Sequence, residues 1–387
     1  MSRPTISKPG LAAVLAALTL SLSLAACGGG AADVGSAPGA DTNASSGDSK
    51  AQQVYADLDA KGADGPEAAV APARDEGEVS WYTTITGADP VGKAFSDRYG
   101  IKVNIFRGNA ETVLQRALQE GQAGRPGADV VEGSFVTMEA LGRERLLGDF
   151  RGPSLADLPD NARFDGWAAD RLNVLLPAWN TDLIRAGDEP RSWEDLADPR
   201  YKGRIQLEIG DSDWFAYVTN YWLREGKSQA EVDRLWQAIA ANAVTAKGHS
   251  TMVEMLAAGQ TAINAMAYSY DIRNTRDEGA PVAYTGADGT TSTPGFARPN
   301  GAGLTSEAPH PNAGWLFENW LLSPEGQKAL LEAGVTPVRR DVPGDNTLDG
   351  VRFVTFDPAE YTQDAAGWDR RYDELLRGVT AVKQDDN

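Results

Sequence analysis

The sequence predicts an α/β fold, in which mostly parallel strands alternate with helices that cover both faces of a sheet. Two observations support this prediction. Short strands, such as residues 79–82 and 101–106, are followed by segments whose apolar residues recur at helical spacing. The chain also has 387 residues, of which 42% are hydrophobic, so it is long enough for two domains with a core each.

The alternation of strands and helices can be followed along the chain. Asp89 and Pro90 start the first helix as N-cap and first-turn residues, and Gly100 ends it. Residues 101–106 then alternate between apolar and polar side chains, as a half-buried strand does. Further strands are predicted at 129–131, 172–179, 205–209, 261–267, 282–284 and 301–305, and further helices at 112–120, 214–222, 232–240, 251–256, 313–321, 323–333 and 368–377.

The first 27 residues have the pattern of an exported lipoprotein. Arg3 and Lys8 precede an apolar run, 11–26, that is too short to span a membrane and is typical of a secretory signal. The sequence Leu-Ala-Ala-Cys that ends at Cys27 resembles the bacterial lipobox, in which the cysteine is lipidated after cleavage. We therefore predict a lipoprotein signal peptide at 1–26 and lipidation of Cys27; a buried structural cysteine is the alternative.

Residues 27–76 are rich in Ala, Gly, Ser and Asp and poor in aromatic residues, so we predict that they form a disordered tether. Cys27 is the only cysteine, and the exported domain is therefore expected to be held by its core without a disulfide. Removal of the two positive charges of Arg3 and Lys8 takes the formal charge from −19 to −21. So acidic a protein is expected to repel nucleic acid and anionic lipid headgroups.

The stretch 204–222 combines a predicted strand, a polar turn and a helix with an aromatic stripe. In open α/β sheets, ligands bind beyond the carboxyl ends of the strands. We therefore predict that Asp211, Ser212 and Trp214 contact a ligand. Core packing of the stripe is the alternative, because apolar periodicity usually reflects packing.

Polar residues also follow two strands of the first half of the chain. Tyr82, Thr84 and Thr86 come at or after the end of the first strand, and their hydroxyl groups suit an oxygen-rich solute. Hydrogen bonds to their own turn are the alternative. Arg107 ends the second strand and is a candidate for a bidentate clamp on a carboxylate or phosphonate, unless it is simply solvated.

Two further strand ends supply candidate ligand contacts. Glu132 and Ser134 end the third strand, and Tyr268 and Tyr270 end a strand in the second half of the chain. Aromatic rings at such a place can cover a solute or stack on a cation. Core packing of one of the two tyrosines is the alternative.

Several motifs, in this order, resemble the bacterial extracellular solute-binding proteins of ABC importers, and among them the branch of the ferric-iron-binding proteins. The resemblance spans about residues 78–342. The motifs are VSWYT at 79–83, GADVV at 127–131, WNTD at 179–182, DPRYKGRI at 198–205, APHPNA at 308–313, LSPEGQ at 322–327 and TPVR at 336–339.

This resemblance implies a two-lobed type II periplasmic-binding-protein fold. Each lobe is then a mostly parallel sheet flanked by helices, with lobe 1 at 77–174 and 300–334 and lobe 2 at 175–299 and 335–382. Two crossing strands, near 172–177 and 281–302, join lobes that close over a solute. The implied function is that of a monomeric, lipid-anchored, extracytoplasmic protein that delivers a small solute to an ABC permease, without catalysis or a cofactor.

The resemblance also implies a set of iron ligands, which this sequence only partly carries. The ferric-iron-binding proteins use a histidine after the first strand, a glutamate after the third and adjacent tyrosines in the second lobe. Thr86, Ser134 and the pair Ser269-Tyr270 stand at these places, so only Tyr270 matches. We therefore expect an oxygen-rich organic anion as solute; ferric iron held by Glu132, Tyr268 and Tyr270 is the alternative.

Two other classes of protein are alternatives. An exported glycosidase would use two carboxylates, but the sequence has neither a nucleophile elbow nor an HExxH motif. Its two histidines, His249 and His310, are expected at the surface, where they offer little acid–base chemistry. A structural envelope lipoprotein is the third possibility.

Overall fold

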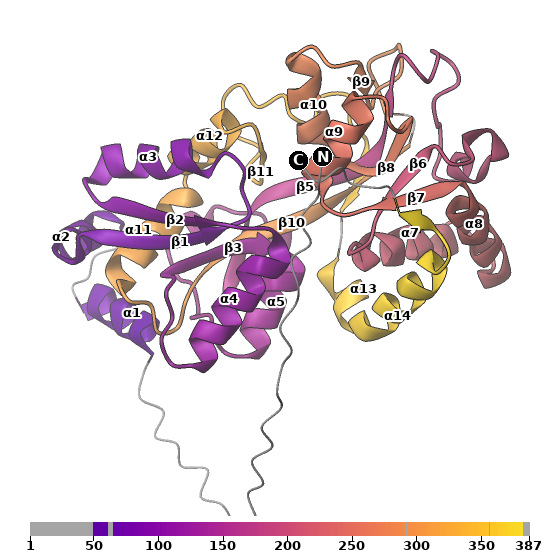
Figure 1. The fold of residues 1–387 in the computed structure, drawn as a ribbon. Helices are drawn as coiled ribbons and strands as arrows, with labels where there is room; N and C mark the ends of the chain where they lie inside the picture. The colour runs from indigo at the N-terminus through magenta and orange to yellow at the C-terminus, as the bar shows by residue number, and fades with distance from the viewer. Residues whose placement is uncertain (1–48, 61–64, 292, 356, 382–387) are drawn as a thin grey trace, which may run out of the picture. The chain divides into compact units, whose positions relative to one another are not determined.

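Two α/β lobes are built on one continuous sheet in the computed structural model, which describes residues 49–60, 65–291, 293–355 and 357–381 (Figure 1). The strand order along the main path of the sheet is β13-β7-β6-β8-β5-β10-β3-β1-β2. We call the part with β1 to β3 lobe 1 and the part with β6 to β8 lobe 2. The two-lobed fold predicted from the sequence is thereby confirmed, whereas the residues at which the chain passes between the lobes stay a prediction.

Lobe 1 has a parallel sheet of β1 (Glu78–Thr83), β2 (Lys102–Arg107) and β3 (Val130–Ser134). Successive side chains of a strand point to opposite faces, and both faces here are apolar. Trp81 packs on Phe317 of one core cluster, while Tyr82 belongs to another cluster with Val113. The helices are α3 (Ala88–Tyr99), α4 (Ala110–Gln122), α5 (Phe135–Arg143), α6 (Pro153–Ala156), α11 (Pro311–Leu321) and α12 (Pro324–Glu332).

Lobe 2 has a parallel sheet of β6 (Ile205–Glu208), β7 (Ala243–Ala246), β8 (Ile263–Tyr268) and the short β13 (Thr380–Ala381). Its core is rich in tryptophan, because the aromatic stripe of 214–222 turns inward: Trp214 and Trp222 both pack on Trp236. The helices are α7 (Ser212–Arg224), α8 (Gln229–Asn242), α9 (His249–Ala257), α10 (Ser269–Asp277), α13 (Pro358–Thr362) and α14 (Ala365–Leu376).

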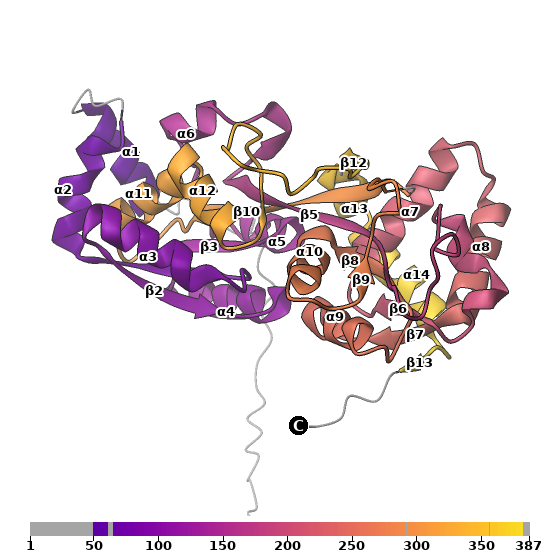
Figure 2. The ribbon, with the colours of Figure 1, turned by 90° about the horizontal axis from the view of Figure 1, so that it is seen from above.

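Two antiparallel strands, β5 (Trp167–Asn180) and β10 (Gly295–Leu304), lie in the middle of the sheet between the lobes (Figure 2). They overlap the two predicted crossings. Their pairing is irregular at two points, between Asn300 and Gly301 and, where β5 meets β8, between Leu176 and Ala178. Gly301 is required by close packing, because a Cβ atom there would lie 2.4 Å from the carbonyl oxygen of Ala168.

Short strands and 3₁₀ helices complete the fold. These are β4 (Arg163–Phe164), β9 (Val282–Ala283) and β11 (Thr336–Pro337), which pair with β5, β12 (Phe353–Thr355), which pairs with β10, and 3₁₀ turns at Asp160–Ala162, Glu194–Ala197 and Pro199–Tyr201. Among the helices of the described residues, none is both long enough and apolar enough to cross a membrane.

The predicted tether is wrong for its C-terminal part, which contains α1 (Lys50–Ala60) and α2 (Glu67–Glu76). Ala51, Ala69 and Ala73 are fully buried in the core cluster of lobe 1, to which α11 also belongs. Alanine has a high helix propensity and packs closely, so a segment poor in aromatic residues still folds here. The signal peptide, Cys27 and the rest of the tether, 28–48 and 61–64, lie outside the described residues.

Candidate functional site

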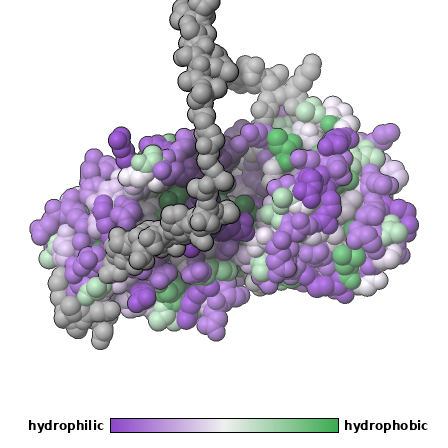
Figure 3. All heavy atoms as spheres, turned by 90° about the horizontal axis from the view of Figure 1, so that it is seen from below, coloured by the Kyte–Doolittle hydropathy of each residue, from purple (hydrophilic) through white to green (hydrophobic). Residues whose placement is uncertain are grey.

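The crossing strands carry polar side chains on one face. Arg298 of β10 lies opposite Asn173 of β5, and Asn300 lies opposite Arg171. Residues two apart on a strand share a face, so these four polar side chains lie together. All four are almost completely buried. Arginine is rarely buried unless it is paired, so partners are expected for Arg171 and Arg298. The surface of the molecule is hollowed between the lobes when it is seen from below (Figure 3).

Arg171 meets the carboxyl ends of the strands of lobe 1. Its Nε and Nη2 atoms lie 3.2 and 2.9 Å from Oε1 of Glu132, at the end of β3. The Thr83 hydroxyl donates to Oε2 over 2.8 Å, and the Thr84 backbone N–H donates to it over 2.7 Å. Nη1 of Arg171 donates to Asn173 and Nη2 also donates to the Thr84 hydroxyl, over 2.6 and 2.8 Å. Both oxygens of Glu132 are thus engaged, and so is every nitrogen of the guanidinium.

Arg298 meets the carboxyl ends of the strands of lobe 2. Its Nη1 atom lies 2.9 Å from Oδ2 of Asp213 and 3.5 Å from Oδ1 of Asp211, and its Nη2 donates to the Tyr268 hydroxyl. Nε2 of His249 lies 2.9 Å from Oδ2 of Asp211. The imidazole ring also stacks on Tyr268, with 4.0 Å between ring centroids. The expected surface position of His249 is therefore wrong.

Electrostatics in this cluster favour the charged forms of Asp211, His249 and Arg298, whereas burial raises the pKa of Asp213 above its usual value. Burial acts to raise the pKa of Asp211, but His249 and Arg298 outweigh it and hold that pKa well below its usual range. Burial acts to lower the pKa of His249, but the charge and hydrogen bond of Asp211 raise it above its ordinary value. Burial also raises the pKa of Tyr268 well above the usual value, so its phenol is neutral.

Helix α10 begins at this cluster. The ring of Tyr270 is nearly parallel to that of Tyr268, at 5.6 Å and 13°, and it packs against the cores of both lobes. Burial raises the pKa of Asp271 in the first turn to about 6, although the charges of His249, Arg171 and Arg107 act in the opposite direction. The first turn of α10 therefore lies in the field of groups from both lobes.

Other predicted residues lie at the rim. Ser134 is the N-cap of α5, where it accepts from the Thr137 N–H over 3.4 Å, and it pairs in register with Asn300. Thr86 and Arg107 are exposed and bonded to each other over 3.1 Å. The Thr86 hydroxyl thus accepts from Arg107 at the end of β2, and its contact with a solute stays a prediction.

Three predicted contacts need correction, because the structure does not bring their side chains to the cluster. Tyr82 points to the opposite face of the sheet, where its hydroxyl donates to Glu120 over 2.9 Å. The Ser212 hydroxyl donates to Asp369 of α14 over 2.5 Å. Trp214 is 1% exposed and lies in the core of lobe 2, as its place in the apolar stripe requires.

Sequence reasoning missed Arg171, Asn173, Arg298, Asn300 and His249. A signal existed for the first four: in each crossing an arginine and an asparagine stand two residues apart within an otherwise apolar strand. Such a pattern places polar groups on one face of a buried strand. No comparable signal marks His249, because its partners are distant in the sequence. Asp211 lies 38 positions before it and Tyr268 lies 19 positions after it.

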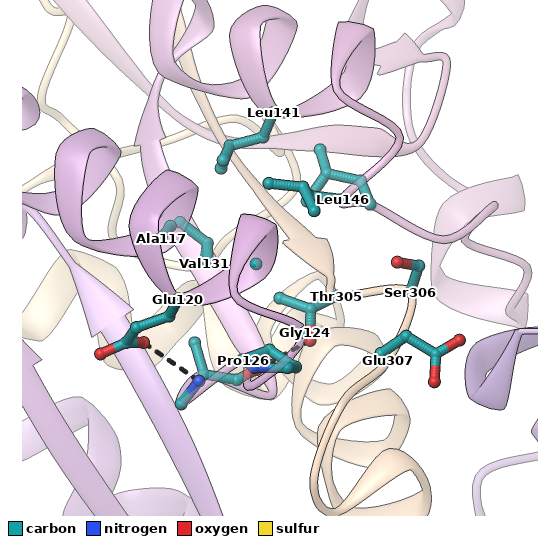
Figure 4. A pocket seen from close by; sticks show the side chains of 14 residues that line it. Ala117, Glu120, Gly124, Pro126, Val131, Leu141, Leu146, Thr305, Ser306 and Glu307 are labelled. Carbon is teal, nitrogen blue, oxygen red and sulfur yellow. Dashed lines mark hydrogen bonds between the residues drawn. The ribbon is translucent and has the colours of Figure 1, made fainter. Parts of the chain in front are cut away.

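A second cavity lies in lobe 1 between α4, α5 and the loops around 124–128 and 305–307 (Figure 4). Its wall is mostly apolar, and Glu120 is fixed there by a hydrogen bond of 3.0 Å from the N–H of Gly127. None of the predicted ligand contacts lines it. The lining residues are Ala117, Glu120, Gly121, Gly124, Pro126, Gly127, Ala128, Val131, Leu141, Leu146, Leu147, Thr305, Ser306 and Glu307.

Comparisons with known proteins agree with this architecture. The Fe(3+)-binding periplasmic protein of Serratia marcescens is 25% identical over 250 residues, which cover 61% of this chain and 70% of that protein. The structure of iron-bound HitA from Pseudomonas aeruginosa superposes with a TM-score of 0.63, at 22% identity, over 76% of this chain and 99% of HitA. AfuA from Actinobacillus pleuropneumoniae, with fructose-6-phosphate bound, also gives 0.63, at 19% identity, over 78% and 99%.

The solved structures are too distant in sequence to show more than a shared fold. A family model of the bacterial extracellular solute-binding proteins, however, matches residues 91–353, which is more than half of the chain. That match spans both crossing strands and the residues that they carry. The chain belongs to the family of bacterial extracellular solute-binding proteins.

Proposed function

We propose that this protein captures a small, oxygen-rich organic anion between its lobes and delivers it to the permease of an ABC importer. One observation carries the choice of an anion. Arg171 and Arg298, one on each crossing strand, bring two buried guanidinium groups to the two sides of the site. Guanidinium groups form strong, directional hydrogen bonds with carboxylate and phosphate oxygens.

The same two arginines stand against ferric iron. They donate hydrogen bonds to Glu132 and to the Tyr268 hydroxyl, two of the three donors that iron would need. A ferric ion bound to either donor would lie beside a buried positive charge, and repulsion between like charges is strong where water is excluded. Within the described part of the chain, no three His, Cys, Asp or Glu side chains are arranged to hold a metal ion.

Ferric iron remains the second candidate because of one arrangement. Tyr268, Tyr270 and His249 stack closely, and phenolate and imidazole are donors that suit a hard cation. Two of the similar proteins are also named for the iron that they bind. Iron binding here would require Arg298 to leave the Tyr268 hydroxyl.

The remaining parts of the proposal concern location and assembly. We propose that the protein acts outside the cytoplasm as a monomer without catalysis of its own, tethered to the membrane through Cys27. Family membership supports binding of a solute and an extracytoplasmic site of action. The lipobox supports the tether.

Native mass spectrometry of the purified protein tests the proposal, because solute-binding proteins often retain their ligand. We expect the added mass of a small organic acid. Thermal unfolding with acetate, succinate, citrate and methylphosphonate should then show stabilisation, about 2.7 kcal/mol at a hundredfold excess over Kd, with glucose as the neutral control. Retained iron, or stabilisation by ferric ion alone, would instead support the second candidate.

A further inference from the structure

Several buried polar atoms around Tyr268 have no hydrogen-bond partner. They include Nε of Arg298 on β10, Nδ1 of His249 on α9 and the hydroxyl of Ser269 on α10; Nε2 of His249 and Oδ2 of Asp211 also form no hydrogen bond, but they face each other at 2.9 Å. The side chains of Arg298 and His249 are only 7% and 13% exposed. More than nine in ten buried polar groups in proteins are bonded, and an unbonded one costs about 1–3 kcal/mol. A partner is therefore expected for these atoms.

We infer that Arg298, His249 and Ser269 form a subsite in lobe 2 that holds the anionic group of the solute. This inference rests on the proposed function and adds the place and orientation of the ligand. The three residues are linked by Tyr268: Arg298 and His249 both contact it, and Ser269 follows it in the chain. Nε of Arg298 is always a donor, and Nδ1 of His249, whose Nε2 faces Asp211, becomes a donor when the imidazole is protonated, as an anion requires.

The carboxylates behind the subsite orient these donors. Asp213 bonds Nη1 of Arg298, so Nε of Arg298 stays available. Asp211 lies at Nε2 of His249, so Nδ1 of His249 stays available. Glu208, whose charge also acts on His249, accepts from the N–H groups of Gly210 and Gly248. Donors fixed in this way bind an anion with little rearrangement.

The start of α10 adds further donors. Tyr268 occupies its N-cap position and makes no side-chain cap hydrogen bond, so the N–H groups of the first turn lack a side-chain cap. Such a helix start attracts a negative charge. In this subsite it supplements the unbonded guanidinium and imidazole.

Lobe 1 is built differently. Four of the five N–H groups of Arg171 are already bonded to Glu132, Asn173 or Thr84, so its guanidinium has one N–H left for a solute. Lobe 1 also presents the hydroxyl groups of Thr84 and Ser134, which are bonded to Glu132 and Thr137. In this arrangement the carboxylate, phosphonate or phosphate of the solute lies in lobe 2, beside the unbonded Nε of Arg298, and its uncharged, oxygen-bearing part lies toward lobe 1.

The two histidines of the chain make a direct test possible. Long-range ¹H–¹⁵N spectra of the full protein should show His249 shifting on addition of methylphosphonate, acetate or inorganic phosphate, while His310 stays unchanged. By calorimetry, His249→Gln should weaken binding of the best of these anions about tenfold or more, as for a lost charged hydrogen bond. His310→Gln is the matched control, because His310 contacts Asp129 of lobe 1 and stands outside the site.

A second variant addresses Arg298, whose loss alone would leave Asp213 as a buried unpaired charge. The pair Arg298→Gln and Asp213→Asn removes both charges together and is also expected to weaken anion binding about tenfold or more. Wild-type affinity in both the His249 variant and this double variant would overturn the subsite and leave the proposed function standing. A wild-type protein that binds ferric ion and none of the three anions would overturn both. Comparison of methylphosphonate and phosphate with acetate tells whether a tetrahedral or a planar anion fits.

Discussion

Arg273 on α10 of lobe 2 donates a hydrogen bond of 2.9 Å to the carbonyl oxygen of Gly334, just beyond the end of α12 in lobe 1. Asn274 donates to the same oxygen over 3.3 Å. Gly334 has φ +86°, and a Cβ atom there would lie 2.7 Å from the Asn274 side chain. Helix α10 thus contacts the candidate site with its first turn and lobe 1 with its second turn. Lys247 and Glu111, 3.7 Å apart, form another contact between the lobes.

Closure of the lobes should depend on this contact. Arg273→Ala is expected to shift the unliganded and liganded protein toward an open form, with weaker solute binding through faster dissociation. Small-angle scattering should show a smaller radius of gyration when wild-type protein is saturated with solute, and a reduced change in the variant. Arg276→Ala is the control, because Arg276 is exposed on the same helix and pairs only with its neighbour Asp277. An unchanged radius across a saturating titration of the wild type would contradict closure.

Loading with iron should leave the protein colourless. Arg298 hydrogen-bonds the Tyr268 hydroxyl, and ferric phenolate would otherwise give a visible charge-transfer band. We expect no such band after incubation with ferric citrate. A red or purple complex that bleaches in Tyr270→Phe would restore the iron hypothesis.

We also expect Arg107→Ala to weaken anion binding, since Arg107 adds positive charge at the rim of the site.

Lipidation of Cys27 should fix the protein to the membrane. Cys27→Ser is expected to appear in the soluble fraction or the medium, because one or more acyl chains would no longer be attached. Fractionation followed by immunoblotting measures this. Ser46→Ala, in the same predicted tether, is the control and should remain with the membrane. A serine variant that stays membrane-bound would show that another segment is the anchor.

The pair of His249 and Asp211 should make stability depend on pH. The folded pKa of His249 is raised, so the stabilisation by its charged form is complete below the ordinary value of about 6.5 and is lost as pH rises through the folded pKa. The charge of Glu208 also raises the pKa of His249, whereas the charge of Arg298 lowers it. The charge of His249 in turn acts to lower the pKa of Asp271. The melting-temperature difference between wild type and His249→Gln should therefore shrink above pH 7. In an Asp211→Asn background that pH dependence should largely vanish; if it persists, the pairing is not its cause.

The fold was predictable because local patterns and global packing agree. Gly100 ends a helix in left-handed backbone conformation, as predicted, and the aromatic stripe of α7 packs inward at helical spacing. The exception is the segment 50–76, whose helices are specified by small residues packed on α11. Composition alone does not record such a contact.

The site was less predictable because it depends on contacts between distant parts of the chain. Glu132 and Tyr268 were found from their places at strand ends, where ligands of α/β folds bind. Their arginine partners were not, since the register of β5 against β10 decides that Arg171 and Arg298 share a face. The prediction for Tyr82 rests only on its place at a strand end, and adjacent strand residues point in opposite directions, so Thr83 reaches Glu132 while Tyr82 reaches Glu120.

The irregular pairing at Asn300/Gly301 and at Leu176/Ala178 has a mechanical consequence. The strands β5 and β10 are hydrogen-bonded into one sheet with both lobes. Rotation of one lobe against the other then becomes torsion of a short ribbon, and a ribbon yields first where its ladder is already interrupted. We therefore expect the twist that accompanies closure of the lobes to concentrate at these two points.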